Sequence, residues 1–164
     1  MPSARGRHDV DVVPGDQPTV REARESDIGG VLELWAAARS VHARTADTPE
    51  VLERLVADRP GSLLVAELEG RIIGALSAVW DGWRGNLYRL AVREEHRRRG
   101  VALRLVQEGE RRLVAGGARR ISVLAARDDA TAAGLWTAAG YDRDNAIGRF
   151  VKNVPPASTT FDPR

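Results

Sequence analysis

The sequence contains no cysteine, which excludes disulfide bonds, metal sites built from thiolates and a covalent acyl-cysteine intermediate. It also lacks any apolar run near the roughly 20 residues that a membrane-spanning helix needs. Residues 1–16 have no continuous apolar core of the kind found in a secretory signal, and proline, glycine and scattered charges occur there instead. We therefore predict a cytoplasmic protein with no membrane partner.

Lysine is almost absent: Lys152 is the only one, so the other 24 of the 25 basic residues are arginine. The formal net charge is nevertheless only +2, which is a poor basis for general nucleic-acid binding. The densest basic run, Arg97 to Arg99 with Arg93 and Arg104 nearby, has no aromatic residues interleaved with it. We therefore predict no nucleic-acid partner.

The 164 residues are enough for one domain with its own hydrophobic core. A hydrophobic content of 43% and a charged content of 29% are typical of globular proteins. We predict one folded domain over residues 18–153. A flexible arm (1–17) is expected before it, and a flexible tail (154–164) after it.

Hydrophobic periodicity predicts alternating strands and helices. Helices are expected at 26–38 with Ser26 as N-cap, at 48–58 with Thr48 as N-cap, at 100–115, and at 130–139 with Asp129 as N-cap. Strands are expected at 18–23, 62–69, 71–80, 86–92 and 121–125, with further extended pieces near Tyr141 and at 149–151. The segments between 62 and 92 suggest an antiparallel meander. Strand 121–125 follows a crossover helix and should lie parallel to 86–92, while Gly109 suggests that this helix packs closely on the sheet.

The segment 87–103 is the most informative part of the chain, because an apolar strand ends at Val92 and a basic loop leads into a helix at Gly100. The loop and the first helical turn offer backbone N–H groups without partners inside the helix, and the helix dipole adds partial positive charge. This arrangement binds pyrophosphate. A cationic run at a helix N-terminus is unfavourable unless an anion lies there. We therefore favour anion binding over a solvated arginine cluster.

Arg97, Gly100 and Ala102 fit the pattern Arg/Gln-x-x-Gly-x-Gly/Ala, which resembles the acetyl-CoA pyrophosphate loop of the GNAT superfamily of N-acetyltransferases. A later segment resembles the family signature Asn-x-x-Ala-x-x-Leu/Phe-Tyr-x-x-x-Gly-Phe/Tyr. Its places are filled by Asp129, Ala132, Leu135, Trp136, Gly140 and Tyr141. The turn from Asp81 to Gly85, Asp-Gly-x-Arg-Gly, is similar to that of a small single-domain bacterial subgroup.

The resemblance implies an α/β (α+β) GNAT fold, in which a mixed, mostly antiparallel, twisted sheet of about six to seven strands is flanked by about four helices. It implies an acetyl-CoA-dependent N-acetyltransferase that works without a metal. Acetyl would pass directly, in a ternary complex, to a primary amine of a small molecule, peptide or protein, and a homodimer is compatible with the fold. The residues that would bind the cofactor are Leu90, Ala91, Val92, Arg97, Arg98, Arg99, Gly100, Val101, Ala102, Leu103, Asp129 and Trp136.

The catalytic groups depart from the family pattern. Trp136 stands where relatives have a tyrosine that protonates the leaving thiolate, and an indole N–H can stabilise a thiolate but not usefully deliver a proton. Asn86 stands where some relatives have a catalytic glutamate, and it cannot act as a base. By strand alternation, Asn86, Tyr88, Leu90 and Val92 should share one face. Asn86 and Tyr88 are the candidate catalytic residues, with a half-buried structural tyrosine and a water chain as the alternatives.

Contacts with the acceptor are implied for the first two helices and the loops between strands. The candidates there are Trp35, His42, Arg44, Trp80 and Trp83. Trp35 also fits the apolar stripe of its helix and His42 is equally a solvated loop residue, whereas Trp83 has little core to fill. Because Asn86 and Trp136 depart from the pattern, a non-catalytic acyl-CoA-binding or sensor module is the alternative function.

Overall fold

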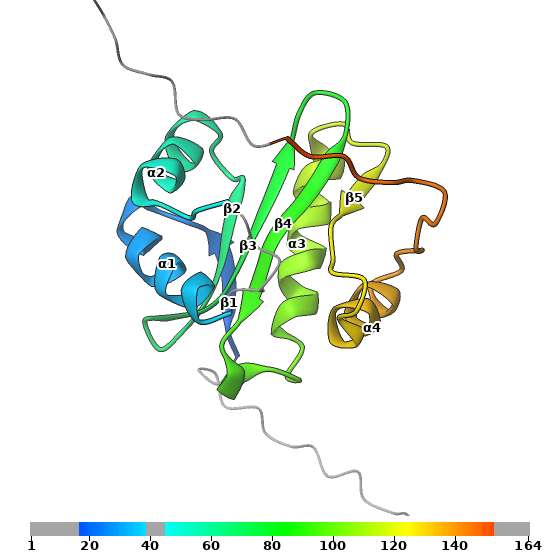
Figure 1. Cartoon of the computed structure of the whole chain (residues 1–164). Helices are drawn as coiled ribbons and strands as arrows, with labels where there is room; N and C mark the ends of the chain where they lie inside the picture. Colours follow the sequence, from blue (N-terminus) through cyan, green and yellow to red (C-terminus); the bar gives the residue numbers. More distant parts are fainter. Residues whose placement is uncertain (1–16, 39–44, 153–164) are drawn as a thin grey trace, which may run out of the picture.

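The computed structural model describes residues 17–38 and 45–152. The predicted arm and tail, apart from Gln17, lie outside the described residues, as do the candidates His42 and Arg44. The described chain forms one five-stranded sheet whose strands follow one another in chain order across the sheet (Figure 1). They are β1 (Thr19–Glu22), β2 (Leu63–Leu68), β3 (Arg71–Trp80), β4 (Gly85–Val92) and β5 (Ile121–Val123). The pairs β1–β2, β2–β3 and β3–β4 are antiparallel, and β5 is parallel to β4 as predicted.

Helices cover both faces of the sheet (Figure 1). One apolar cluster joins the sheet to α1 (Ile28–Ala37) and α2 (Pro49–Asp58), and a second joins it to α3 (Val101–Ala115). The last helix, α4 (Ala130–Ala138), adds Trp136 to the α3-side cluster. Short 3₁₀ turns, η1 (Glu25–Asp27) and η2 (Glu94–His96), precede α1 and the α3 loop. The predicted mixed fold with four helices is thus confirmed, and no helix in the described part is long and apolar enough to cross a membrane.

The described sheet has fewer strands than the six to seven predicted, because the pieces near Tyr141 and at 149–151 are not strands. In the second piece the side chains of Phe150 and Val151 are 99% and 74% exposed, and Ile147 shortly before it is 68% exposed. Only three residues of β5 pair with β4, so this strand offers few backbone groups to a further neighbour. The β-prone residues of 149–151 therefore lie in solvent without a ladder.

The N-terminus of α1 differs from the prediction that Ser26 is its N-cap. The turn η1 comes first, and the carboxylate of Asp27 accepts a hydrogen bond from the backbone N–H of Arg24 at 2.7 Å. It also accepts two from the guanidinium of Arg21 in β1, at 2.6 and 2.9 Å. Arg21 outweighs burial and lowers the pKa of the Asp27 carboxyl. The Asp27 carboxylate, which is paired with Arg21 of β1, thus accepts the hydrogen bond at the start of this helical segment in place of the Ser26 hydroxyl.

Two glycines bring α3 close to the sheet and so place its first turn. A Cβ on Gly109 would lie 3.1 Å from Leu76 Cδ2 and 3.3 Å from Ala78 Cβ, which confirms the predicted close packing. A Cβ on Gly74 of β3 would lie 2.9 Å from Leu105 Cδ1, near the start of the helix. The N-terminus of α3 is therefore held at the end of β4, where the basic loop begins.

Candidate active site

A β-bulge interrupts β4 in its second half. Ser77 pairs with Tyr88 and Ala75 pairs with Ala91, so two residues of β4, Arg89 and Leu90, lie opposite the single residue Leu76 of β3. Arg89 takes a φ of +54°, a left-handed conformation that few residues other than glycine adopt. A bulge of this kind bends the strand and re-aims the side chains beyond it.

The bulge reverses the alternation of side chains along β4. Leu87 and Val92 both belong to the α3-side cluster and Leu90 packs against it, although an odd number of positions separates Leu87 from Val92. Asn86 and Tyr88 flank Leu87 and so lie on the opposite face, toward α1 and α2. The expectation that Asn86, Tyr88, Leu90 and Val92 share one face is therefore wrong, because it assumed an unbroken strand.

Beyond the bulge, no strand of the described chain pairs with β4 on the side of β5. The β5 ladder joins only residues 85–87 of β4, and β4 runs on past the end of β5 (Figure 1). On the β3 side, the N–H of Arg93 donates to Ile73 at 2.8 Å, so by alternation the N–H and C=O of Val92 point to the open edge. An extended ligand can add to this edge as a strand would.

The loop after β4 presents a row of unpaired backbone donors. Neither a backbone nor a side-chain acceptor in the described part of the chain takes a hydrogen bond from the N–H groups of residues 98–103. The first helical bond runs from the N–H of Arg104 to the carbonyl of Gly100, at 3.0 Å. Arg98 and Gly100 have φ of +61° and +78°. These donors and the helix dipole together form an anion site at the start of α3.

The arginine side chains of this loop have different partners. Arg97 Nε donates to the carbonyl oxygen of Val92 at 3.0 Å, so its guanidinium is tied to the end of β4. Arg98 and Arg99 are exposed and form no ion pair with any residue that the structure describes. The backbone, supplemented by Arg98 and Arg99, is thus better placed than Arg97 to hold a phosphate.

The second predicted motif opens and fills α4. The carboxylate of Asp129 accepts from the N–H of Ala132 at 2.9 Å and caps the helix, as predicted for this position. Trp136 is 9% exposed, and its ring meets that of Tyr141 edge-on with centroids 5.3 Å apart. The indole N–H of Trp136 makes no hydrogen bond and is not among the buried unpartnered atoms of the described residues, so it reaches the surface.

The phenol oxygen of Tyr141, in contrast, is buried. Burial, with a smaller effect from the carboxylate of Glu110, raises the pKa of this phenol. No hydrogen bond of normal geometry joins the phenol oxygen to a described residue. Tyr141 therefore stays a neutral packing partner of Trp136.

The candidate catalytic side chains lie on β4 just before the bulge. Asn86 is half-buried, and its amide donates to the carbonyl of Arg84 at 3.4 Å. Tyr88 is 41% exposed, and its hydroxyl makes no hydrogen bond with a described residue. Neither is joined to a carboxylate or a histidine, so this face provides a polar surface rather than an evident side-chain base.

The three candidate acceptor tryptophans, Trp35, Trp80 and Trp83, do not lie together. Trp35 is 5% exposed within the α1-side cluster, which supports the core interpretation, and its indole N–H has no partner among described residues. Trp83 is 79% exposed in the turn between β3 and β4, with the guanidinium of Arg84 5.6 Å from its ring centroid. Trp80 ends β3 beside the same turn. Both lie at the opposite end of β4 from the basic loop.

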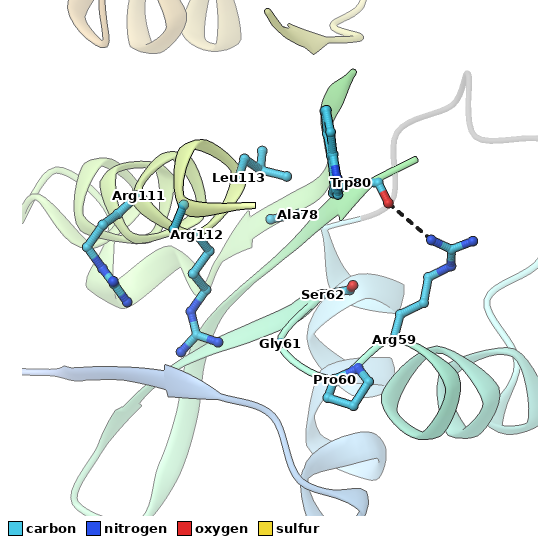
Figure 2. Close-up of a pocket in the computed structure, with 10 residues that line it drawn as sticks. Arg59, Pro60, Gly61, Ser62, Ala78, Trp80, Arg111, Arg112 and Leu113 are labelled. Carbon is cyan, nitrogen blue, oxygen red and sulfur yellow. Dashed lines mark hydrogen bonds between the residues drawn. The ribbon is translucent and has the colours of Figure 1, made fainter. Parts of the chain in front are cut away.

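A hollow of about 390 Å³ lies between the end of α2 and the second half of α3 (Figure 2). Its arginines already have partners: Arg59 donates to the carbonyl of Trp80 at 3.1 Å, and Arg111 and Arg112 both bind Glu108. Arg111 chiefly, and Arg112 to a smaller extent, lower the pKa of the Glu108 carboxyl to about 2. The hollow contains none of the predicted cofactor residues and is distinct from the anion site.

Sequence reasoning missed Arg89 and Asp47. Arg89 Nη2 lies 2.8 Å from Asp47 Oδ1 and donates to the carbonyl of Thr45 at 2.9 Å. Glycine or asparagine would have marked a left-handed bulge position, but arginine gives no such signal.

No group of three or more potential metal ligands lies together within residues 17–38 and 45–152.

Comparisons with known proteins agree with this geometry. The model of the acetyltransferase (GNAT) family matches residues 29–141. An acetyltransferase of Pectobacterium atrosepticum is 32% identical over 129 residues, which cover 78% of this chain and 90% of that protein.

Solved structures share the fold at low identity. An aminoglycoside acetyltransferase from an uncultured soil metagenomic sample, in complex with sisomicin, has a TM-score of 0.66 and 18% identity, over 84% of this chain and 97% of that one. The aminoglycoside N-acetyltransferase AAC(6')-Iy in complex with CoA has a TM-score of 0.66 and 16% identity, over 83% of this chain and all of that one.

Proposed function

Because the chain belongs to the acetyltransferase (GNAT) family and is an N-acetyltransferase, we propose that it transfers acetyl from acetyl-CoA directly to a primary amine of a small molecule or peptide. The main support for this proposal comes from two sets of backbone groups that a ligand can bind. They are the edge of β4 beyond the bulge and the N–H groups of residues 98–103. The catalytic domain is proposed to extend over residues 18–153.

The cofactor site is proposed to divide between strand and loop. Residues 98–103 would hold the pyrophosphate through their N–H groups, because these donors and the helix dipole suit a dianionic group. The open edge at Leu90 to Val92 would pair with the pantetheine arm, and a backbone N–H there would hold the thioester oxygen as negative charge develops on it. Arg97 occupies only the Val92 carbonyl, so the N–H of Val92, which points to this edge, is the donor proposed for this role.

Acetyl-CoA supplies an activated acetyl thioester. The amine must first lose the proton of its ammonium form, whose pKa is about 10.4 for a lysine side chain. Its nitrogen then bonds to the carbonyl carbon, the C–S bond breaks, CoA leaves as a thiolate, and the nitrogen releases its second proton to water or to that thiolate. In our proposal Asn86 and Tyr88 orient the amine or a water that takes up its proton, and Asp129 and Trp136 shape the sulfur end of the site, with Asp129 acting through the α4 cap.

The acceptor class is proposed as a small-molecule or peptide amine. The aminoglycoside enzymes that share the fold do so at under 20% identity, so they support the type of reaction rather than a particular acceptor. The proposal includes neither a metal nor a nucleic acid, in line with the absence of cysteine and the small net charge.

A panel of primary amines tests the proposal. Purified protein is incubated with acetyl-CoA and, separately, polyamines, aminoglycosides, amino acids and short peptides, while release of free CoA thiol is measured. We expect thiol release that depends on one class of amine, with the acetylated amine detected by mass spectrometry. Tight CoA binding without transfer to any amine would favour the sensor module, and the absence of CoA binding would contradict the site itself.

A further inference from the structure

The residue that opens the bulge is strained and well anchored at the same time. Arg89 has a φ of +54°, and this region strains the backbone of a residue other than glycine. Such a conformation persists when surrounding contacts hold it. The contacts that hold Arg89 come from its own guanidinium.

Those contacts reach a segment far away in sequence. Thr45 and Asp47 lie in the connection between α1 and α2, directly before the Thr48 N-cap of α2. The side chains of Arg89 and Asp47 are only 29% and 14% exposed, so solvent screens this pair less than a surface pair. The Arg89–Asp47 pair therefore fastens the start of α2 to the middle of β4.

The Arg89–Asp47 pair lies between two parts of the proposed site. On one side of the bulge, Leu90 to Val92 offer the edge proposed to bind the pantetheine arm. On the other, Thr45 and Asp47 contact Arg89, the residue next to Tyr88. We propose that Arg89 and Asp47 are positioning residues that couple occupation of the cofactor edge to the position of residues 45–47. This inference rests on the proposed cofactor site.

The coupling has a simple mechanical basis. A strand-like ligand on the β4 edge fixes the backbone of the bulge, and the direction of the Arg89 side chain follows from that backbone. Because both partners of the guanidinium lie within three residues of each other, segment 45–47 moves with it. The pair is electrically neutral as a unit, so its effect is geometric rather than an attraction for a charged acceptor.

Hydrogen exchange with CoA as the only added ligand tests the coupling without an acceptor. In the wild type, CoA should slow amide exchange in residues 98–105 and, about threefold or more, in residues 45–52. In Asp47→Asn, CoA should still protect residues 98–105 but no longer residues 45–52. Asp144→Asn, which breaks the exposed pair with Arg120, is the matched control and should behave as the wild type.

Variants of Arg89 separate its backbone from its side chain. Arg89→Gly accepts a positive φ without cost, so it should keep protection of residues 98–105 and lose that of residues 45–52. Arg89→Lys, with one charged nitrogen in place of the planar fork, should restore part of the protection of residues 45–52. Recovery in this conservative variant would not follow from a merely space-filling role.

The outcomes distinguish this inference from the proposed function. If CoA protects residues 98–105 in the wild type but never residues 45–52, or protects both equally in Asp47→Asn, the coupling is wrong and the cofactor site stands. If CoA protects neither segment in the wild type, the cofactor site is wrong, and the coupling is wrong with it.

Discussion

At the scale of single residues, Gly100 makes the sharpest demand on the anion site. Its φ is +78°, and no atom lies within 4 Å of where a Cβ would be, so a substitution is opposed by backbone conformation alone. Gly100→Val should weaken CoA binding about tenfold or more, since the strain is on the order of 1–2 kcal/mol. Calorimetric titration with CoA measures this directly.

Two variants serve as controls for Gly100. Gly70, in the turn between β2 and β3, has a φ of +75° and equally open surroundings, so Gly70→Val should carry a similar strain while leaving CoA affinity unchanged. Arg97→Ala should weaken CoA binding less than Gly100→Val, because Arg97 binds the Val92 carbonyl. A larger loss in Arg97→Ala would mean that side-chain charge holds the phosphate.

Trp136 is a second test at this scale. Because the ring is largely buried, Trp136→Phe and Trp136→Tyr, which keep an aromatic ring, are better probes than alanine. We expect both to retain CoA binding, and Trp136→Tyr to transfer acetyl faster than Trp136→Phe, since a hydroxyl of pKa about 10 is available near the sulfur. Transfer rates from pH 6 to 10 provide the comparison. Equal rates throughout would make Trp136 a core residue only.

The lowered pKa of Asp27 predicts that the stability of the fold depends on pH. Its pKa is lowered from 3.8, chiefly by Arg21, so its contribution is fully present above that pH and is lost as the pH falls through the lower folded-state value. Asp27→Asn should reduce the free energy of unfolding by about 2 kcal/mol at pH 7. The difference from wild type should shrink below pH 3.8, as urea unfolding at several pH values would reveal. If the difference in unfolding free energy between wild type and Asp27→Asn did not change with pH, the stabilisation would not come from the charge of Asp27.

Sequence reasoning succeeded with residues whose chemistry is local. Asp129 caps α4 and Gly109 packs on the sheet because capping and close approach leave a signature in the residue type itself. Ser26 failed as a cap because Asp27 has a partner, Arg21, which periodicity cannot place. The bulge at Arg89 was invisible for a similar reason: the contacts that hold it come from Asp47 and Thr45, over forty residues earlier in the chain.

At the scale of elements, the close packing of α3 on the sheet predicts that two helical glycines respond differently to substitution by alanine. Gly109 and Gly134 both lie inside helices, but a Cβ on Gly109 would meet Leu76 at 3.1 Å, whereas nothing lies within 4 Å at Gly134. Gly134→Ala should therefore raise the free energy of unfolding by about 0.5–1 kcal/mol. Gly109→Ala should gain less or lose stability. Urea unfolding of the pair measures the contrast, and equal gains would mean that α3 does not press on β3.

Strongly periodic elements were predictable, and elements that depend on a neighbour were not. The order of strands and helices up to α4 follows from alternation and apolar stripes. The pieces near Tyr141 and at 149–151 have β-prone residues, but a strand exists only where a partner edge is available, and the short β5 does not extend one to them. The shared face expected for Asn86, Tyr88, Leu90 and Val92 failed because a single inserted residue changes the register.

At the scale of the whole molecule, arginine supplies nearly all the positive charge, yet the proposed pyrophosphate site depends on backbone donors. CoA affinity should therefore change less than about tenfold between low and moderate salt, since a partly enclosed amide array is screened less than surface ion pairs. Titration with CoA at several NaCl concentrations measures this. A loss of several orders of magnitude would indicate that exposed arginines carry the binding.

The most direct test of the account is a crystal structure of the full chain with CoA bound. We predict that pyrophosphate oxygens lie within hydrogen-bonding distance of the N–H groups of residues 98–103, and that the pantetheine arm pairs with β4 at Leu90 to Val92. Phosphate oxygens bound instead to Arg59, Arg111 and Arg112 in the hollow between α2 and α3, or a pantetheine arm away from the β4 edge, would contradict it.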